Sequence, residues 1–328
     1  MARKKTSTKL LSDLMRRDEK GILVPLVRKF LFDLAMRAHL DPSEEKAFTI
    51  DVYSYKKAFM DEMLKQYTQR KARVRGKGEF HPSQLFGCER AIWLSVLGAP
   101  SNAPCSATDE LRKHLIFSMG DSVHLRWQTI LTLVGVLEKA EVPVENKKYD
   151  LIGHCDGILN INGERMALEI KSINSMGFSR LTEPKEDHVR QVSIYMDCLG
   201  LEKGIILYEN KDRHEVKEYV IKKSKKVVRE YKQVIDRVKI AINENVPPKK
   251  ESPTPNSTAC RWCNYTHICH TEAKMKLFQD KKKGKSYASQ SKKKTKVKSA
   301  RFLGKKIRLS SLKKVKSSSA LREFVGKG

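Results

Sequence analysis

The stretch 149–172 constrains the fold of this chain more than any other, because it has the pattern of a β-hairpin. Two apolar-rich runs, 151–161 and 165–170, are joined by Asn162 and Gly163. An Asn-Gly pair accepts the positive φ angles that a tight hairpin turn requires. The sequence therefore predicts two antiparallel strands that meet at this turn.

The same hairpin carries polar residues that fit a divalent-cation site. Asp156 lies in the first predicted strand, and Glu169 and Lys171 lie on either side of Ile170 in the second. Strand alternation puts Glu169 and Lys171 on one face, while Ile170 points into the core. Carboxylate oxygens are the ligands that magnesium and manganese prefer. A surface hairpin with ordinary charges is the alternative that these residues alone leave open.

The net charge of the chain indicates a polyanionic partner. The formal charge is +28 over 328 residues, and the sequence pI is about 9.8. Residues 271–328 hold 20 Lys and Arg against 3 Asp and Glu, in lysine- and serine-rich runs. We expect this segment to be a disordered tail. Nucleic acid is the partner that such a charge fits best.

The sequence shows neither a membrane span nor a secretion signal. No run approaches the roughly 18 apolar residues that a span needs, and the first residues lack the apolar segment of a signal peptide. We therefore expect a reducing location, the cytoplasm of a bacterium or of a phage-infected cell. Seven cysteines in such a chain predict metal ligands and buried thiols rather than disulfides.

Four of these cysteines have the spacing of a metal site. Ser83 is expected to cap a helix that carries the first of them, Cys88, toward the interior beside Ile92. The other three follow a proline-rich approach far downstream, at Cys260, Cys263 and Cys269. A fourth ligand is needed to complete a site with these three, and Cys88 would supply it.

The spacing leaves the identity of the metal open. A zinc site that combines the Cys-x2-Cys pair with His267 or His270 fits the pattern. A [4Fe-4S] cluster held by four thiolates fits it as well.

Two predicted helices flank the hairpin in the sequence. Residues 117–128 are expected to be helical, with Gly120 and His124 on one face. After the hairpin, a second helix from about Pro184 to Gly200 places Gln191 and Tyr195 on one face. The predicted elements that follow are a buried strand at 204–208, an alternating strand at 214–221 and a basic amphipathic helix at 222–243.

In this order, the motifs resemble those of the PD-(D/E)xK nuclease superfamily, specifically its RecB-like branch. The matching residues are Gly120 with His124, Asp156 with Gly157, Glu169 to Lys171, and Gln191 with Tyr195. One cysteine before the core and three after it are similar to the iron-sulfur members of that branch, the AddB-type and CRISPR-adaptation nucleases. The resemblance spans residues 80–270. His154 and Cys155 depart from the pattern, because a proline often precedes the aspartate motif, and we expect them to be structural.

The resemblance implies an α/β fold with a restriction-endonuclease-like core, in which helices flank a central mixed sheet. It divides the chain into three parts. These are a helical N-terminal region at 1–79, a nuclease domain with an iron-sulfur cluster at 80–270, and a basic, disordered tail at 271–328.

The resemblance also implies roles for the site residues. The groups that would hold Mg²⁺ or Mn²⁺ are Asp156, Glu169, the backbone carbonyl of Ile170 and His124. Lys171 would position the attacking water, and Gln191 and Tyr195 would line the DNA channel. The thiolates that would hold a [4Fe-4S] cluster are those of Cys88, Cys260, Cys263 and Cys269.

The function that this resemblance implies is a metal-dependent DNA nuclease. We expect an exonuclease that acts on single strands or duplex ends in recombination, repair or replication. A catalytically weak nucleic-acid-binding scaffold and a CRISPR-type adaptation nuclease are the alternatives. The tail is expected to tether DNA through its charge, or instead to bind a helicase or a single-strand-binding protein through its apolar residues.

Overall fold

The computed structural model describes residues 21–40, 57, 61, 78–101, 107–282, 300–302 and 305–307. The chain divides into two compact units, residues 1–291 and 292–328. In the second unit, the short strands β6 (Ala300–Phe302) and β7 (Lys305–Ile307) pair antiparallel. The other helices and strands described below belong to the first unit.

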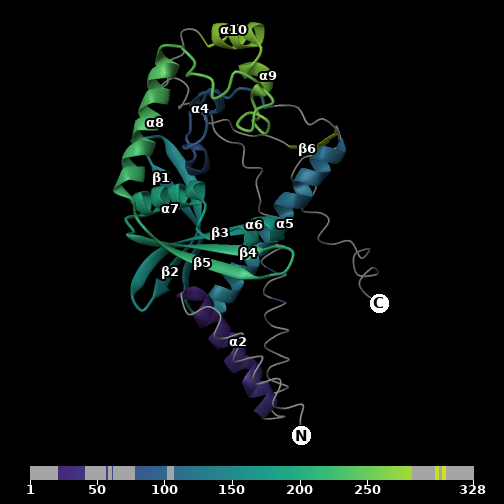
Figure 1. Cartoon of the computed structure of the whole chain (residues 1–328), viewed down its shortest axis with the longest axis vertical. Coiled ribbons are helices and arrows are strands. Elements are labelled where there is room, and N and C mark those ends of the chain that lie inside the picture. The colour runs from purple at the N-terminus through teal and green to yellow at the C-terminus, as the bar shows by residue number, and fades with distance from the viewer. Residues whose placement is uncertain are drawn as a thin grey trace. The chain divides into compact units, whose positions relative to one another are not determined.

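The first unit contains a five-stranded mixed sheet with the strand order β1-β2-β3-β4-β5. The strands are β1 (Leu137–Asn146), β2 (Leu151–Ile161), β3 (Glu164–Ile173), β4 (Lys203–Asn210) and β5 (Val216–Lys222). Neighbouring strands are antiparallel except β3 and β4, which run parallel (Figure 1). A parallel pair requires a crossover, which the helices α6 (Ser175–Ser179) and α7 (Glu186–Leu199) provide. The predicted mixed sheet flanked by helices is confirmed.

The predicted hairpin is the β2–β3 pair. Its turn residues, Asn162 and Gly163, both have positive φ angles, of 53° and 85°. The side chain of Asn160 closes the turn, since its Oδ1 accepts a hydrogen bond from the Gly163 N–H at 3.1 Å. The turn chemistry of the Asn-Gly pair thus fixes the register of the two strands that carry the polar residues.

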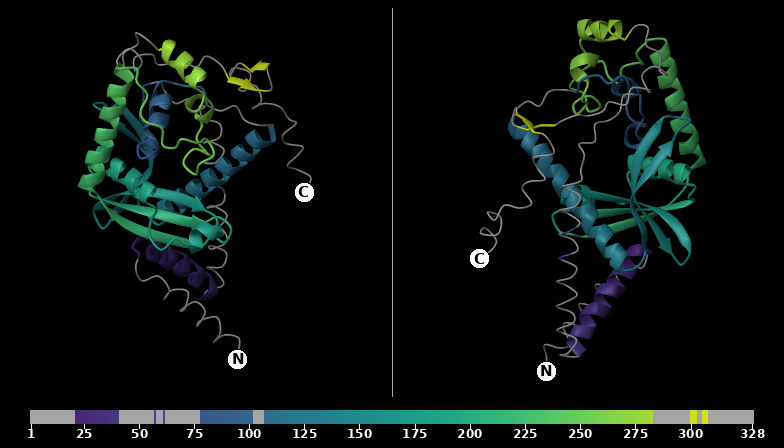
Figure 2. Two further views of the ribbon diagram at one scale, coloured as in Figure 1. Left: turned by 45° about the horizontal axis from the view of Figure 1, so that its top comes forward. Right: turned by 180° about the vertical axis from the view of Figure 1, so that it is seen from behind.

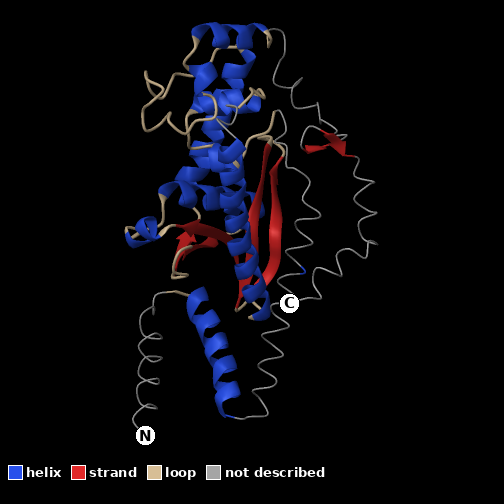
Figure 3. Ribbon diagram, turned by 90° about the vertical axis from the view of Figure 1, so that its right-hand side faces the viewer, coloured by secondary structure: helices blue, strands red, loops and turns tan. Residues whose placement is uncertain are grey.

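Helices cover both faces of the sheet. On one face, Val192 and Met196 of α7 pack in a cluster with Ala167 of β3. On the other face, α5 (Ala107–Leu133) and α2 (Leu23–Leu40) contribute Trp127 and Leu23 to a second cluster, which also contains the strand residues Leu168, Ile170, Ile205 and Leu207. Figure 2 shows α7 and α2 on opposite sides of the sheet, and Figure 3 shows the strands with the helices around them.

The first turn of α2 is attached to strand β5. The N–H groups of Leu23 and Val24 donate to Glu218 Oε2 at 2.9 and 2.5 Å. A carboxylate at a helix N-terminus satisfies amides that have no partner within the helix. The start of α2 therefore packs with the sheet, although it lies within the predicted N-terminal region, 1–79.

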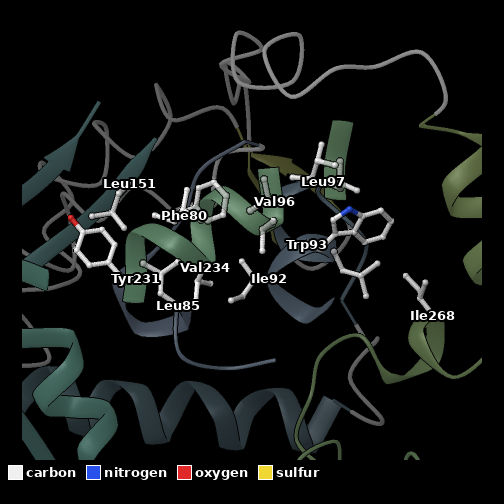
Figure 4. Packing of buried hydrophobic residues seen from close by; sticks show 14 of the residues in the cluster. Phe80, Leu85, Ile92, Trp93, Val96, Leu97, Leu151, Tyr231, Val234 and Ile268 are labelled. Atoms are coloured by element: carbon white, nitrogen blue, oxygen red, sulfur yellow. The ribbon is translucent and has the colours of Figure 1, made fainter. Parts of the chain in front are cut away.

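A third apolar cluster joins α4 (Glu89–Val96) and α8 (Lys225–Asn243) to α9 (Thr266–Cys269) and α10 (Glu272–Asp280). Figure 4 shows part of it, with Trp93 of α4 and Ile268 of α9 pointing toward one another. Trp93 also meets the ring of Phe278 edge to face, with centroids 5.9 Å apart. Because Met275 and Phe278 of α10 are buried, the predicted start of the disordered tail at residue 271 is wrong for this helix. Most of the remaining tail lies outside the described residues.

The predicted environment of Cys88 is also wrong in detail. Ser83 does not cap its helix, because it lies in a separate 3₁₀ turn, η1 (Pro82–Gln84). Helix α4 begins only at Glu89, and Cys88 itself is the N-cap residue, with extended backbone angles. Cys88 therefore lies immediately before the first turn of α4 rather than within the helix. Ile92 is buried, as expected.

Among the described helices, none combines the length and the apolar composition that crossing a membrane requires.

Candidate active site

Asp156 and Glu169 lie where the ladder between β2 and β3 ends. The last pair of the ladder joins Gly157 to Leu168. Beyond this pair, Asp156 Oδ2 accepts a hydrogen bond from the Ile170 N–H at 2.7 Å. The carboxylate takes the place of a main-chain acceptor and holds the two strands together at this point. The hairpin therefore brings the two predicted carboxylates into one site.

Lys171 leaves β3 on the same face as Glu169. Its Nζ lies 2.5 Å from Glu169 Oε1 and donates to Gln191 Oε1 at 3.3 Å. Gln191 Nε2 in turn donates to Tyr195 Oη at 2.7 Å. Both residues belong to α7, so the crossover helix orients the lysine. The side chain of Ile170 points to the opposite face and is fully buried, as strand alternation predicts.

His124 of α5 reaches the same site from the other side of Asp156. Its Nδ1 lies 3.3 Å from Asp156 Oδ1. Glu141 of β1 joins them, and one ligand atom from each of these three residues lies within 4.8 Å of the others. Gln128, one turn along α5, donates through Nε2 to Glu141 Oε1 at 3.1 Å and to the main-chain oxygen of Asp156 at 2.9 Å. The structure thus adds Glu141 to the predicted residues.

No sequence pattern singles out Glu141. It is one of three glutamates in β1, and nothing in the spacing sets it apart from Glu138 or Glu145. Its place depends on the register of β1 against β2, which pairs Ala140 with Gly157 and Val142 with Cys155. Glu141 lies between these pairs, opposite Asp156, and only pairing between two strands can establish this.

The charges of the site influence one another. Burial and the neighbouring charge of Asp156 raise the pKa of Glu169 to about 7. Burial lowers the pKa of Lys171, but the charge and hydrogen bond of Glu169 together with the charge of Asp156 outweigh burial, so the pKa is raised. His124 follows the same pattern: burial lowers its pKa, but the hydrogen bond to Asp156 and the charges of Asp156, Glu169 and Glu141 together raise it further. The lysine therefore stays charged beside a carboxyl group that is hard to ionise.

One atom of this site is left without a partner. Glu169 is only 2% exposed, and its buried Oε2 accepts no hydrogen bond from any described residue. Leaving a buried carboxylate oxygen unsatisfied costs free energy, because water no longer solvates it. A cation placed at this oxygen would remove that cost.

Cys155 is a structural neighbour of Asp156. Its buried thiol contacts the carbonyl oxygens of Gly157 and Leu168 at 3.2 and 3.3 Å. Burial raises the pKa of this thiol to about 12, so it stays protonated at neutral pH and is a poor metal ligand.

A second group of candidate ligands lies away from the sheet, around α4 and α9. The cavity there is lined by all four predicted cysteines, Cys88, Cys260, Cys263 and Cys269. None of the six cysteines that the structure describes forms a disulfide. His270 also lines the cavity, and its Nε2 is buried without a hydrogen-bond partner among the described residues. The fold therefore brings together the thiols from before and after the core, together with one of the two histidines of the zinc alternative.

Comparison with known proteins gives a consistent picture. Residues 58–270 match the model of the PD-(D/E)XK nuclease superfamily. The CRISPR-associated exonuclease Cas4 of Saccharolobus solfataricus is 30% identical over 161 residues, which cover 46% of this chain and 70% of that protein.

Similar solved structures include SSO0001 and an alkaline exonuclease, LHK-Exo, from Laribacter hongkongensis. SSO0001 is 20% identical with a TM-score of 0.40, covering 69% of this chain and 97% of its own. LHK-Exo is 12% identical with a TM-score of 0.34, covering 49% of this chain and 86% of its own. Scores this low add no weight to the sequence matches.

Proposed function

Because this chain belongs to the PD-(D/E)XK nuclease superfamily, we propose that it is a divalent-metal-dependent deoxyribonuclease that acts as an exonuclease. The observation that carries the proposal is the convergence of Asp156, Glu169 and Lys171 at the end of the β2–β3 ladder. A surface hairpin with ordinary charges would not bury Glu169 with an unsatisfied oxygen. The burial of this oxygen therefore supports an active site at these residues.

The residues present fit Mg²⁺ or Mn²⁺. Asp156, Glu169 and the main-chain carbonyl of Ile170 supply hard oxygen ligands, and His124 supplies a nitrogen beside Asp156. The unpaired Glu169 Oε2 supports a cation at this position. When bound, the cation polarises the scissile phosphate and lowers the pKa of the attacking water. A nitrogen ligand favours manganese over magnesium.

Side chains near that site would position the attacking water and the phosphate. Lys171 is charged and held by Glu169 and Gln191, so it can position the attacking water and stabilise the negative charge that develops on the phosphate. Tyr195 fixes Gln191 in turn. Burial raises the pKa of Tyr195 well above its ordinary value, so its hydroxyl remains a neutral hydrogen-bonding group near the DNA.

The biological setting is a further part of the proposal. We assign the enzyme to recombination, repair or replication, with DNA single strands or duplex ends as substrate. The relative named as a CRISPR-associated exonuclease supports a second candidate, a nuclease of CRISPR adaptation. A catalytically weak scaffold is the third, and the Lys171–Glu169 contact argues against it, because a protein that only binds DNA does not need this pair.

The experiment that tests the proposal compares three labelled DNA substrates with and without Mg²⁺ or Mn²⁺. End-labelled single strands and linear duplexes should be degraded from their ends only when the cation is present, while a closed circle should survive. Cleavage in EDTA would contradict the metal dependence, and cleavage of the circle would replace the exonuclease with an endonuclease.

We also propose that Cys88, Cys260, Cys263 and Cys269 hold a [4Fe-4S] cluster. Their common cavity supports this, because four thiolates are the usual ligands of such a cluster. The unpartnered Nε2 of His270 in the same cavity supports the alternative, a zinc ion with mixed cysteine and histidine ligands. Iron and zinc contents of the purified protein distinguish the two.

The tail beyond residue 282 lies largely outside the described residues. Its lysine-rich composition supports our proposal that it tethers the enzyme to DNA by electrostatic attraction. Recruitment of a helicase or a single-strand-binding protein is the rival role for the same segment.

A further inference from the structure

Glu209 is a buried carboxylate that has no role in the function proposed above. It lies near the end of β4 and is only 1% exposed. Its main chain is paired on both sides, with Ser172 of β3 and with Val216 of β5. A side chain on a strand that is held from both sides is a rigid anchor, so a group that binds Glu209 is fixed to the sheet.

Three side chains converge on this carboxylate. Trp127 Nε1 donates to Glu209 Oε2 at 2.6 Å, and Arg126 Nη2 donates to Glu209 Oε1. Nδ1 of the His214 ring lies 2.8 Å from the same Oε1. Burial raises the pKa of Glu209, but these hydrogen bonds and the charge of Arg126 together outweigh burial, so the pKa is lowered. The carboxylate therefore stays ionised and only accepts hydrogen bonds.

Two of these donors belong to the segment of α5 that carries His124, which precedes them by two and three residues. From the same segment, His124 Nδ1 lies 3.3 Å from Asp156 Oδ1. Gln128 Nε2 donates to the main-chain oxygen of Asp156 at 2.9 Å. The segment 124–128 is therefore attached to β2 at the active site and to β4 through Glu209.

Apolar packing constrains the rotation of α5 only weakly. Val123, Trp127 and Leu131 are buried in the cluster between the helix and the sheet. Other large apolar residues of the same helix are exposed: Leu111, Leu115, Ile116, Phe117 and Met119. Hydrophobic attraction has no preferred direction, whereas a hydrogen bond weakens steeply as its angle closes. The directed bonds to Glu209 therefore select one rotation of α5 on the sheet.

We propose that Glu209 is a positioning residue for the metal site. By accepting hydrogen bonds from Arg126 and Trp127, it fixes α5 on the sheet, and the fixed helix presents the His124 ring to Asp156. This inference rests on the proposed function, because His124 is a proposed ligand of the cation. A residue that orients a metal ligand commonly contributes about 10–100-fold to metal affinity. The role should therefore be visible in cation binding before any DNA is added.

The test measures Mn²⁺ binding to the full-length protein in the absence of DNA. Glu209→Gln keeps the size of the side chain but turns an N–H donor toward groups that also donate, so α5 should lose this attachment. The Mn²⁺ affinity of the variant should fall at least about 10-fold relative to the wild type. Electron spin echo spectroscopy of bound Mn²⁺ should show the imidazole nitrogen of His124 in the wild type. This signal should be lost in Glu209→Gln, as in His124→Ala.

A double-mutant cycle separates positioning from a general weakening of the fold. In a His124→Ala background, Glu209→Gln should reduce Mn²⁺ affinity by less than about 2-fold, because the residue through which Glu209 acts is already gone. An equal loss in both backgrounds would overturn the inference, since a general weakening does not depend on His124. Full affinity and an unchanged nitrogen signal in Glu209→Gln would overturn it as well.

Two further variants keep the test decisive if Glu209→Gln does not fold. Trp127→Phe removes one donor and keeps an aromatic ring in the apolar cluster, so Mn²⁺ affinity should fall about 3-fold, and only while His124 is present. An unchanged affinity in this variant would then overturn the inference. Glu215→Gln is the matched control, because Glu215 accepts from Asn210 in the adjacent turn, and it should bind Mn²⁺ as the wild type does.

The same measurements separate this inference from the proposed function. If the wild type shows the His124 nitrogen signal and Glu209→Gln matches it, the metal site stands and only the positioning role is lost. If the wild type binds Mn²⁺ without a nitrogen signal, the positioning role fails and the carboxylate ligands stand. If the wild type binds no Mn²⁺ that Asp156→Ala removes, the proposed function and the inference fail together.

Discussion

The β2–β3 hairpin with its polar site and the cysteine cavity belong to the same unit but are built by different means. In the hairpin, Asp156 and Lys171 belong to two strands joined by a tight turn. In the cavity, Cys88 precedes the strands of the sheet in sequence, and the other three thiols follow helix α8. The first site is assembled by main-chain hydrogen bonds between neighbours, and the second by apolar packing between helices that are distant in sequence.

This difference predicts how each site fails. A substitution in the hairpin can remove the chemistry while the sheet persists, because the core residues on the opposite face remain in place. A substitution in the cavity should loosen the contact between the two ends of the domain, because Leu94 lines the cavity and also belongs to the apolar cluster that joins α4 to α9 and α10. Four experiments test this contrast, ordered by their expected effect on the turnover of bound DNA.

The variant Lys171→Ala should have the largest effect. It removes the charge that positions water and stabilises the transition state, so cleavage should fall at least about 100-fold. DNA affinity and melting temperature should change little. Single-turnover cleavage of bound oligonucleotide measures the loss, with Lys203→Ala, which removes a surface ion pair with Glu164, as the control. An unchanged rate in Lys171→Ala would show that the active site lies elsewhere.

Cys88→Ala should act on the other site. Protein purified without oxygen should contain about four iron atoms and be brown, and the variant should lose most of the iron and melt at a lower temperature. Turnover should fall only as far as the fold is weakened. Cys198→Ala removes a half-buried thiol that does not line the cavity, and it should keep its iron. A colourless wild type with one equivalent of zinc would support the His270 alternative instead.

Gly157→Ala should have an intermediate effect through the backbone. A Cβ atom there would lie 2.7 Å from Leu137 Cδ1 and 3.0 Å from the Lys139 carbonyl oxygen. Strand β1 would have to move away from Asp156, which should cost about 1–3 kcal/mol of unfolding free energy and reduce cleavage.

Gly120→Ala is the matched control for that substitution, and urea denaturation of both variants measures the difference. A Cβ at Gly120 would meet no atom within 4 Å, so alanine should stabilise the helix by about 0.5–1 kcal/mol. Equal stability of the two variants would mean that the approach of β1 to β2 does not position Asp156.

Truncation after Lys282 should leave turnover unchanged. This end point keeps α10, whose Met275 and Phe278 are buried, and removes the lysine-rich remainder. If the tail contacts five or six phosphates, the slope of log affinity against log salt should flatten by about four to five units. An unchanged slope, with activity lost only in the presence of a partner protein, would favour recruitment over tethering.

The sequence was sufficient for the hairpin because its information is local. An Asn-Gly turn and strand alternation decide which side chains share a face. These rules placed Glu169 and Lys171 on one face of the strand and Ile170 on the opposite face, in the core. The helical spacing of Gln191 and Tyr195 was local in the same way. The fold class was implied by the family resemblance that these motifs carry in their order.

Only the tertiary structure decided what depends on contacts between distant segments. It placed Glu141 opposite Asp156 through the pairing of β1 with β2, set Cys88 at the start of α4 beside the three later thiols, and buried α10 against Trp93. Periodicity and turn chemistry describe a residue's own strand or helix, whereas these placements depend on which apolar faces and which strand edges find one another when the whole chain is packed.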